Sequence, residues 1–402
     1  MSDALIRVAV LSDIHAAIPG DKGLVDSYAS TAPSADSIYR DAILSLEKFI
    51  ESSGVRADYL VCCGDMANKA NPTAMNYIWK KYNEIAKQLG AVPVTTVGNH
   101  DIDSRYTESD FDARGVLRRL HPSYPLLDPT KTHEYWSRNF VVLNYARARF
   151  IVLNSCAYHG VNPDPKAPEY AHGRISVSTL DDLKTTINHE SGHCIVNALI
   201  CHHHPHKHQD VDDDDYSSMQ GGEKLIDLLA ESTLGTWMVI HGHRHHPRLV
   251  YAAGAGRAPI IFGAGSLSAK LNGALAARAR NQFYIVEFDG SKSDSLDIAG
   301  QVRAWDYALG SGWVPAKKNS GLPSRSGFGY RLQVRPDALR VANAVRNLDG
   351  IAKWENLLHA VPELAFTLPA DLQSLERELI QNHNIAMISD EFGEPIHFAS
   401  RA

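Results

Sequence analysis

The stretch VPVTTVGNHD, residues 92–101, joins an apolar run to a cluster of polar side chains. Its first six residues have the length and the β-branched content of a buried strand. Two earlier apolar runs, Ile6–Leu11 and Tyr59–Cys63, likewise lead directly to polar side chains. Helical spacing over residues 36–53 and 73–89 separates the three runs, and each helix ends at a glycine. This alternation predicts an α/β fold built on a largely parallel sheet.

The rest of the first 300 residues continues this pattern of apolar runs and helices. Five further strands are expected at residues 150–154, 195–201, 237–240, 260–262 and 283–288. Helices are expected from about residue 178 to 188 and from 222 to 232. We therefore assign residues 1–310 to one domain.

The composition changes after residue 310. Residues 310–329 are rich in Gly, Ser, Pro and Lys, which predicts a linker or a long loop. Helical spacing follows at residues 336–348, 351–361 and 370–381, and residues 386–398 are typical of a short strand or hairpin. Residues 311–402 are thus expected to form a linker and a mainly helical C-terminal extension of unknown role.

Composition and charge narrow the class of protein. The 402 residues carry 40 Lys and Arg against 46 Asp and Glu, a net charge of −6, and 44% are hydrophobic, as in globular proteins. No run approaches the ~18 apolar residues of a membrane span, and the mild acidity argues against a broad grip on nucleic acid. The five cysteines are odd in number and lie mostly in apolar runs. With no leader-like segment at the start, we expect a cytoplasmic protein with reduced cysteines.

Side chains of metal-binding type follow five of the predicted strands. They are Asp13, His15, Asp65, Asn99, His202, His243 and His245. Ligands bind at the carboxyl ends of strands in open α/β sheets, so we expect these side chains to meet. Carboxylate, imidazole and amide oxygen together suit Mn, Fe, Co, Ni or Zn better than Ca or Mg. Seven candidates are too many for one tetrahedral zinc, but they suffice for two metals about 3.5–4 Å apart if one carboxylate bridges, an arrangement that recurs in phosphoester hydrolysis.

The same positions form five short motifs in a fixed order. They are D-x-H at 13–15, G-D at 64–65, G-N-H-D at 98–101, H-H-x-P at 202–205 and G-H-x-H at 242–245. This ordered set resembles the calcineurin-like metallophosphoesterase superfamily, and the resemblance covers roughly residues 5–300. It implies a four-layer α/β/β/α sandwich whose second sheet comes from strands after about residue 150.

The resemblance also implies the cofactor, two divalent transition-metal ions with Mn or Fe favoured. One metal would be held by Asp13, His15 and His245. The other would be held by Asn99, His202 and His243. Asp65 would bridge the two, and a metal-bridged hydroxide would attack phosphorus.

Two residues of the G-N-H-D motif receive catalytic roles from the same resemblance. His100 would lie beside the scissile phosphate as a general acid or charge stabiliser, a role worth about 10²–10⁴ in rate. Asp101 would orient the ring of His100.

Several alternatives stay open at the level of the sequence. The motif order selects His202 as a ligand, with His203 as the alternative. The His/Asp-rich segment 203–215 is either a solvated loop or an extra cation site or substrate lid. Further pocket candidates, each more simply explained as an ordinary loop or packing residue, are Arg105, His121, His133, His159 and His172.

We therefore expect a hydrolase that acts on a small-molecule phosphodiester, with cyclic nucleotides among the candidates. The first alternative is a phosphomonoesterase or pyrophosphohydrolase, and a nuclease comes third. A metal-binding scaffold without catalysis is the least favoured, because no core motif is missing. A homodimer is a candidate assembly, and variable loops outside the motifs would determine the substrate.

Overall fold

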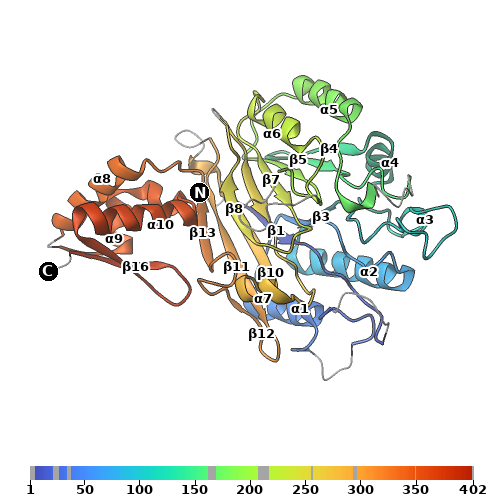
Figure 1. Cartoon of the computed structure of the whole chain (residues 1–402), viewed down its shortest axis with the longest axis horizontal. Coiled ribbons are helices and arrows are strands. Elements are labelled where there is room, and N and C mark those ends of the chain that lie inside the picture. The colour runs from blue at the N-terminus through green and yellow to red at the C-terminus, as the bar shows by residue number, and fades with distance from the viewer. Residues whose placement is uncertain are drawn as a thin grey trace.

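The computed structural model describes residues 5–20, 27–33, 38–161, 169–206, 217–254, 257–292, 297–348 and 350–400. Two large sheets lie at the centre of the molecule, and a smaller lobe built from the last 70 or so residues projects to one side (Figure 1). Within the described residues, no helix combines the length and the apolar character that crossing a bilayer requires.

The first sheet has seven strands and combines both ends of the domain predicted for residues 1–310. Its order is β12 (Gly312–Pro315), β11 (Gly300–Ala308), β10 (Gln282–Asp289), β1 (Leu5–Leu11), β2 (Tyr59–Cys62) and β3 (Val92–Thr95), with β13 (Arg325–Phe328) also paired to β11. Strands β1, β2 and β3 run parallel, as the sequence predicts, whereas β10 pairs with β1 in the antiparallel sense. The carboxyl ends of β1, β2 and β3 therefore share one edge.

The second sheet has six strands. Its order is β4 (Phe140–Asn144), β5 (Ala148–Leu153), β6 (Val196–Ile200), β7 (Met238–His241), β9 (Ile260–Gly263) and β8 (Arg248–Tyr251). The central strands β5, β6, β7 and β9 are parallel, and the edge strands β4 and β8 are antiparallel to their neighbours.

Alternation along the second sheet explains why it lies inside the molecule. In β6, Ala198 and Ile200 pack into the core shared with the first sheet, whereas Leu199 packs into a second core under the helices. A strand with apolar residues on both faces must be covered on both faces. Helices α5 (Val177–His189) and α6 (Gly222–Ala230) supply that cover, and α1 (Ala42–Ser53) and α2 (Pro72–Leu89) cover the first sheet (Figure 1). The predicted four-layer sandwich is confirmed.

Local signals set the ends of the helices that frame the site. The Asp41 carboxylate accepts hydrogen bonds from two backbone N–H groups at the start of α1, and the side-chain oxygen of Asn71 accepts one, from Ala74, at the start of α2. Both helices end at a glycine with a left-handed backbone, Gly54 and Gly90. The remaining short helices of this part are α3 (Gly115–Arg118), α4 (Pro129–Arg138), α7 (Gly273–Arg278), η3 (Glu169–Ala171) and η4 (Gly290–Lys292).

The segment expected to be a linker belongs to the first sheet. Residues 310–329 contain β12 and β13, so the sheet continues past residue 310. The buried Trp313 donates its indole N–H to Ala42 O at 3.2 Å, and the ring of Phe328 packs on Phe288. These two aromatic anchors bury a segment whose Gly, Ser and Pro content is typical of a loop.

The last part of the chain is a mixed unit with its own core. Helices α8 (Val334–Arg346), α9 (Trp354–Ala360) and α10 (Pro369–Glu378), with the short turns η5 (Pro362–Phe366) and η6 (Leu379–His383), pack on a three-stranded antiparallel sheet. Its order is β14 (Ile351–Lys353), β16 (Pro395–Ser400) and β15 (Ile385–Ser389). The hairpin near the end is confirmed, but the extension is less helical than expected because residues 351–353 pair with β16.

Candidate metal centre and active site

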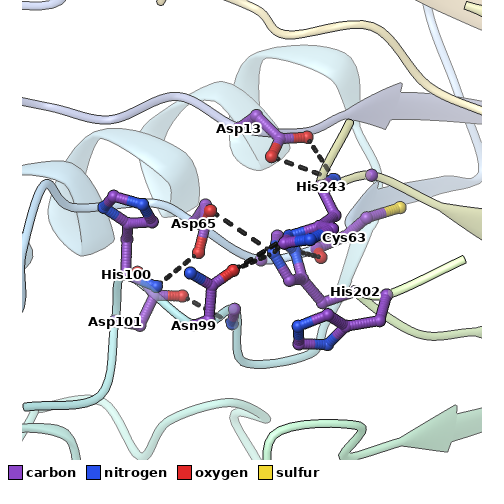
Figure 2. Close-up of polar contacts among 12 residues, drawn as sticks. Asp13, Cys63, Asp65, Asn99, His100, Asp101, His202 and His243 are labelled. Carbon is purple, nitrogen blue, oxygen red and sulfur yellow. Dashed lines mark hydrogen bonds and ion pairs between the residues drawn. The ribbon is translucent and has the colours of Figure 1, made fainter. Parts of the chain in front are cut away.

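The seven candidate ligands lie in the turns that follow β1, β2, β3, β6 and β7, and they converge on one region. Figure 2 shows five of them: Asp13, Asp65, Asn99, His202 and His243. Five of them have a left-handed backbone with φ between 50° and 75°. They are Asp13, His15, Asp65, His243 and His245. Residues other than glycine seldom adopt this conformation, and it concentrates at functional sites.

Backbone hydrogen bonds hold these turns against one another across both sheets. The N–H of Asp13 donates to Gly64 O at 3.1 Å, and the N–H of His15 donates to Asp65 O at 2.9 Å. The N–H of His243 donates to both carboxylate oxygens of Asp13, at 3.0 and 3.1 Å, which links the second sheet to the first. The backbone therefore sets the relative positions of the ligands before any metal binds.

One group of ligand atoms comes from Asp13, His15 and His245. The Nε2 atoms of His15 and His245 lie 3.1 Å apart, and His245 Nε2 lies 3.4 Å from Asp13 Oδ1. The side chains of Asp13 and His15 are buried, and that of His245 is 19% exposed. This is the set that the sequence assigns to the first metal.

A second group comes from Asn99, His202 and His243. Asn99 Oδ1 lies 2.8 Å from His202 Nε2 and 3.0 Å from His243 Nδ1. His202 Nδ1 lies 2.9 Å from Cys63 O, and it can donate its hydrogen there. That contact fixes the tautomer and aims the lone pair of Nε2 into the site, as in many metal-binding histidines.

Asp65 lies between the two groups. Its Oδ2 is 3.3 Å from His202 Nε2 and 3.7 Å from His15 Nε2, and its Oδ1 accepts the N–H of His100 at 2.7 Å. Its carboxylate therefore reaches ligand atoms of both groups, which is the geometry required of a bridge.

This donor set fits two divalent cations. The carboxylates of Asp13 and Asp65 are buried, and in the part of the chain that the structure describes neither pairs with Lys or Arg. Burial raises the pKa of Asp65, but nearby imidazoles, His202 foremost, hold it well below its usual range. Burial lowers the pKa of His202, but the Asp65 carboxylate outweighs this and raises it to about 9. A bound cation would replace the proton that His202 otherwise carries between the two acids.

His100 and Asp101 do not interact as the sequence predicts. The Asp101 carboxylate accepts the N–H groups of Ala67 at 3.0 Å and Gly98 at 2.9 Å, and the hydroxyl of Tyr124 at 3.3 Å. Among the described residues, the buried His100 Nδ1 has no hydrogen-bond partner, so no contact of Asp101 with this atom supports the predicted orienting role, which stays a prediction. Asp101 instead holds the loops after β2 and β3, because their backbone N–H groups need a buried acceptor.

The ring of His100 packs edge-on against His15, with centroids 4.7 Å apart, and it lines a pocket beside the candidate ligand Asn99. This pocket, which we call the His100 pocket, has a volume of about 170 Å³. Its lining includes Lys69, Arg105 and Tyr170, of which the sequence singled out only Arg105. Lys69 could have been found from its place four residues after Asp65, but no local signal marks Tyr170.

The other candidates are placed as follows. His203 is buried with Nδ1 2.9 Å from Ser155 Oγ, while His202 contacts both Asn99 and Asp65, which favours His202 as the ligand. His159 Nε2 lies 2.9 Å from His172 O, and neither residue lines the His100 pocket. Residues 207–215 of the expected loop 203–215 lie outside the described residues. The last two candidates, His121 and His133, line a separate cavity beside Trp136.

A sequence model of the calcineurin-like phosphoesterase family matches residues 6–247, a range that contains all seven candidate ligands. The chain belongs to this family. Members of the family bind two divalent metals and hydrolyse phosphoric esters, in agreement with the His/Asp groups described above. No curated protein matches the chain.

Solved structures with a related fold include a purple acid phosphatase from yellow lupin (Lupinus luteus) seeds, with 13% identity and a TM-score of 0.45. PhoD matches with 11% identity and a TM-score of 0.49, covering 77% of this chain and 68% of its own. The Haemophilus influenzae NAD nucleotidase has 11% identity, a TM-score of 0.36 and coverages of 71% and 47%. The match to the lupin phosphatase covers 77% of this chain, which spans about half (52%) of that protein.

Proposed function

We propose that this family member is a dinuclear metal-dependent phosphoesterase that hydrolyses a small phosphodiester, with cyclic nucleotides among the candidate substrates. The observation that carries the proposal is the pair of ligand groups joined by Asp65. The first group, Asp13, His15 and His245, would hold one metal. The second, Asn99, His202 and His243, would hold the other. When bound, two such metals activate water and neutralise phosphoryl oxygens.

The protein's own residues supply the rest of the chemistry. His100 lies next to both the ligand groups and the pocket, so its imidazole can hold a proton at the leaving oxygen of the ester. Burial lowers the pKa of this imidazole. An imidazole with a lowered pKa releases its proton more readily, and Asp101 keeps the loop that carries it in place.

The test compares Mn²⁺-loaded protein on bis(p-nitrophenyl) phosphate and on p-nitrophenyl phosphate. We expect faster turnover of the diester, and a loss of turnover in Asp65→Asn. Arg56→Gln, whose side chain is exposed on the loop after α1, is the matched control and keeps the rate. Faster turnover of the monoester would replace the proposal with a phosphatase, and no turnover with two metals bound would support a scaffold.

A pyrophosphohydrolase is the second candidate, and one observation favours it. The His100 pocket is lined by two cationic side chains, Lys69 and Arg105, which fit a substrate with more than one phosphate. The choice of Mn or Fe, a homodimer and a cytoplasmic location stay predictions from the sequence.

A further inference from the structure

A further group of metal-binding side chains lies beside the candidate dinuclear centre, and the proposed function does not use it. The group consists of Cys156, His159 and His203, whose candidate ligand atoms all lie within 4.8 Å of one another. All three residues are buried, with at most 1% of each exposed. Thiolate and imidazole are the usual ligands of zinc in proteins, so this group differs in chemistry from the carboxylate-containing set described above.

The second sheet brings these three residues together. Cys156 lies in the turn after β5, and His203 lies in the turn after β6. The two strands are parallel neighbours, so their carboxyl ends share the edge at which His202 also lies. The N–H of His159 donates to Cys156 O at 3.1 Å, and this turn places His159 beside Cys156. The sheet edge therefore assembles this group in the same way as it assembles the candidate ligands that follow β6 and β7.

The distance between Cys156 and His203 fits two ligands of one ion. Cys156 Sγ lies 3.7 Å from His203 Nδ1. In a tetrahedral zinc site, with bonds of about 2.3 Å to sulfur and about 2.0–2.1 Å to nitrogen, these atoms are roughly 3.6 Å apart. Ser155 Oγ lies 2.9 Å from the same nitrogen, and it accepts the backbone N–H of His203 at 3.1 Å. The hydroxyl would therefore keep this backbone partner if an ion took the lone pair of Nδ1.

His159 is oriented as metal-binding histidines are. Its Nε2 lies 2.9 Å from His172 O, and it can donate its hydrogen there. The lone pair is then on Nδ1, which is buried and has no hydrogen-bond partner among the described residues. A buried acceptor without a partner is unfavourable, and a bound cation would satisfy it.

The segment at residues 172–173 holds both imidazole rings. A Cβ atom on Gly173 would lie 2.5 Å from the Cβ and Cγ atoms of His203, so the close approach of this backbone requires glycine. The preceding residue supplies His172 O, the acceptor that fixes His159. The two rings are therefore set in place before any ion binds.

The third side chain, Cys156, is also fixed. Its backbone N–H donates to Asn154 Oδ1 at 3.0 Å, and its thiol donates to Val97 O at 3.6 Å. Burial raises the pKa of this thiol, so an ion must displace its proton. The guanidinium of Arg114, which donates to Ala157 O, acts in the opposite direction and favours the thiolate.

We propose that Cys156, His159 and His203 form a third cation site, of zinc type, beside the dinuclear centre. One thiolate and two imidazole nitrogens would hold the ion and leave the fourth tetrahedral position to a small ligand such as water. The ion replaces the thiol proton, which goes to solvent, and no electron is transferred. The ring of His203 packs on that of His243 with centroids 4.4 Å apart, so the ion would also support the second ligand group.

Titration of the metal-free protein with Co²⁺, in the absence of oxygen, tests the site. A bond between cobalt and a thiolate gives an absorption band in the near ultraviolet, and none of the seven candidate ligands of the dinuclear centre contains sulfur. We expect three ions per chain and a thiolate band that saturates with one of them. Cys156→Ala should bind one ion fewer and lose the band. Cys62→Ala is the matched control, because Cys62 is equally buried but belongs to none of the ligand groups found in the described residues, and it should keep both.

His159→Gln separates loss of the ion from loss of the fold, because it keeps the thiol. We expect it to weaken Co²⁺ binding at the third site by about tenfold or more, with an unchanged circular dichroism spectrum.

A wild-type protein without the thiolate band would overturn the inference, and so would a band that persists in Cys156→Ala. If Cys156→Ala does not fold, His159→Gln decides: weaker growth of the band supports the site, and unchanged growth overturns it. The band requires no turnover, so this inference and the proposed function fail independently of each other.

Discussion

At the scale of single residues, the site depends on buried groups that keep unusual protonation states. Asp101 is buried beside the charged Asp65, and burial first, then that charge, raises its pKa to about 7. His15 shows the opposite shift, because burial lowers its pKa to about 3. The neutral form of His15 is the form that can bind a metal, so burial prepares this ligand at neutral pH.

His100→Ala should retain both metals and lose turnover by about 10²–10⁴, because none of the residues assigned to the metals changes. The loss should be largest for a diester with an aliphatic leaving alcohol and smaller for p-nitrophenolate, which leaves without a proton. Metal content by elemental analysis and kcat on both substrates test this. A near-wild-type kcat on the aliphatic diester would show that His100 is not the acid.

His159 should make the folded state sensitive to acid. Burial lowers its pKa from 6.5 to about 4, so the unfolded chain takes up a proton at a higher pH than the folded protein. The stability from neutral His159 is present above pH 6.5 and is lost as the pH falls toward 4. Between pH 7 and pH 5, the wild type should lose about 1–2 kcal/mol more free energy of unfolding than His159→Gln. Urea melts with chelator present measure this, and equal losses would contradict it.

At the scale of elements, the turns after the strands are packed so closely that glycine is required in two of them. A Cβ atom on Gly98 would collide with the backbone N and the carboxylate of Asp65, and one on Gly242 would collide with Ser12 and Asp13. The motifs G-N-H-D and G-H-x-H therefore contain glycine for a steric reason as well as ligands for a chemical one.

Gly98→Ala should displace Asp65 and lower the affinity for at least one metal by about tenfold or more, a size known for changes that disturb the support of a metal ligand. Gly54→Ala is the control, because Gly54 ends α1 with φ of 65° and a Cβ there meets no atom within 4 Å. The control should lose stability but bind metal normally. Isothermal titration with Mn²⁺ compares the two, and equal affinities would refute this account of Gly98.

The elements also show what the sequence can predict. The candidate ligands directly follow strands. An apolar run therefore predicts the strand, and the short polar motif after it predicts the site residues. Six strands were not predicted: β4, β8, β11, β12, β13 and β14. Strand β14 has only three residues, and it pairs with β16, more than 40 residues further along the chain. The contact between Arg105 and Tyr170 likewise joins segments that no local pattern connects.

At the scale of the whole molecule, the candidate metal centre draws its residues from both large sheets. Asp13, Asp65 and Asn99 belong to the first sheet, and His202 and His243 belong to the second. Metals held by both would add a clamp between layers that otherwise meet through apolar side chains and a few hydrogen bonds, such as that from the N–H of His243 to Asp13. The order of the motifs predicts that these residues meet, whereas the pocket beside them includes residues of loops that no motif marks, such as Tyr170.

Removal of metal should therefore destabilise the whole fold. At a free metal concentration of 100 times Kd, each site contributes about 2.7 kcal/mol, so chelation should lower Tm by on the order of 5–10 °C. Asp65→Asn should have a lower Tm with metal present and a smaller response to chelator. Calorimetry of both proteins measures this, and an unchanged wild-type Tm in chelator would show that the sites do not couple the sheets.

The pairing of β1 with β10 has a consequence for synthesis. Strand β1 ends at Leu11, and β10 begins at Gln282, about 270 residues later. A ribosome adds that many residues in roughly 15–55 s. During that time one edge of the first strand has no native neighbour, and unpaired edges of this kind attract other chains. The edge of β1 therefore stays unpaired until after His245, the last candidate ligand, has been made, and the nascent chain is a natural client for chaperones that bind extended apolar segments.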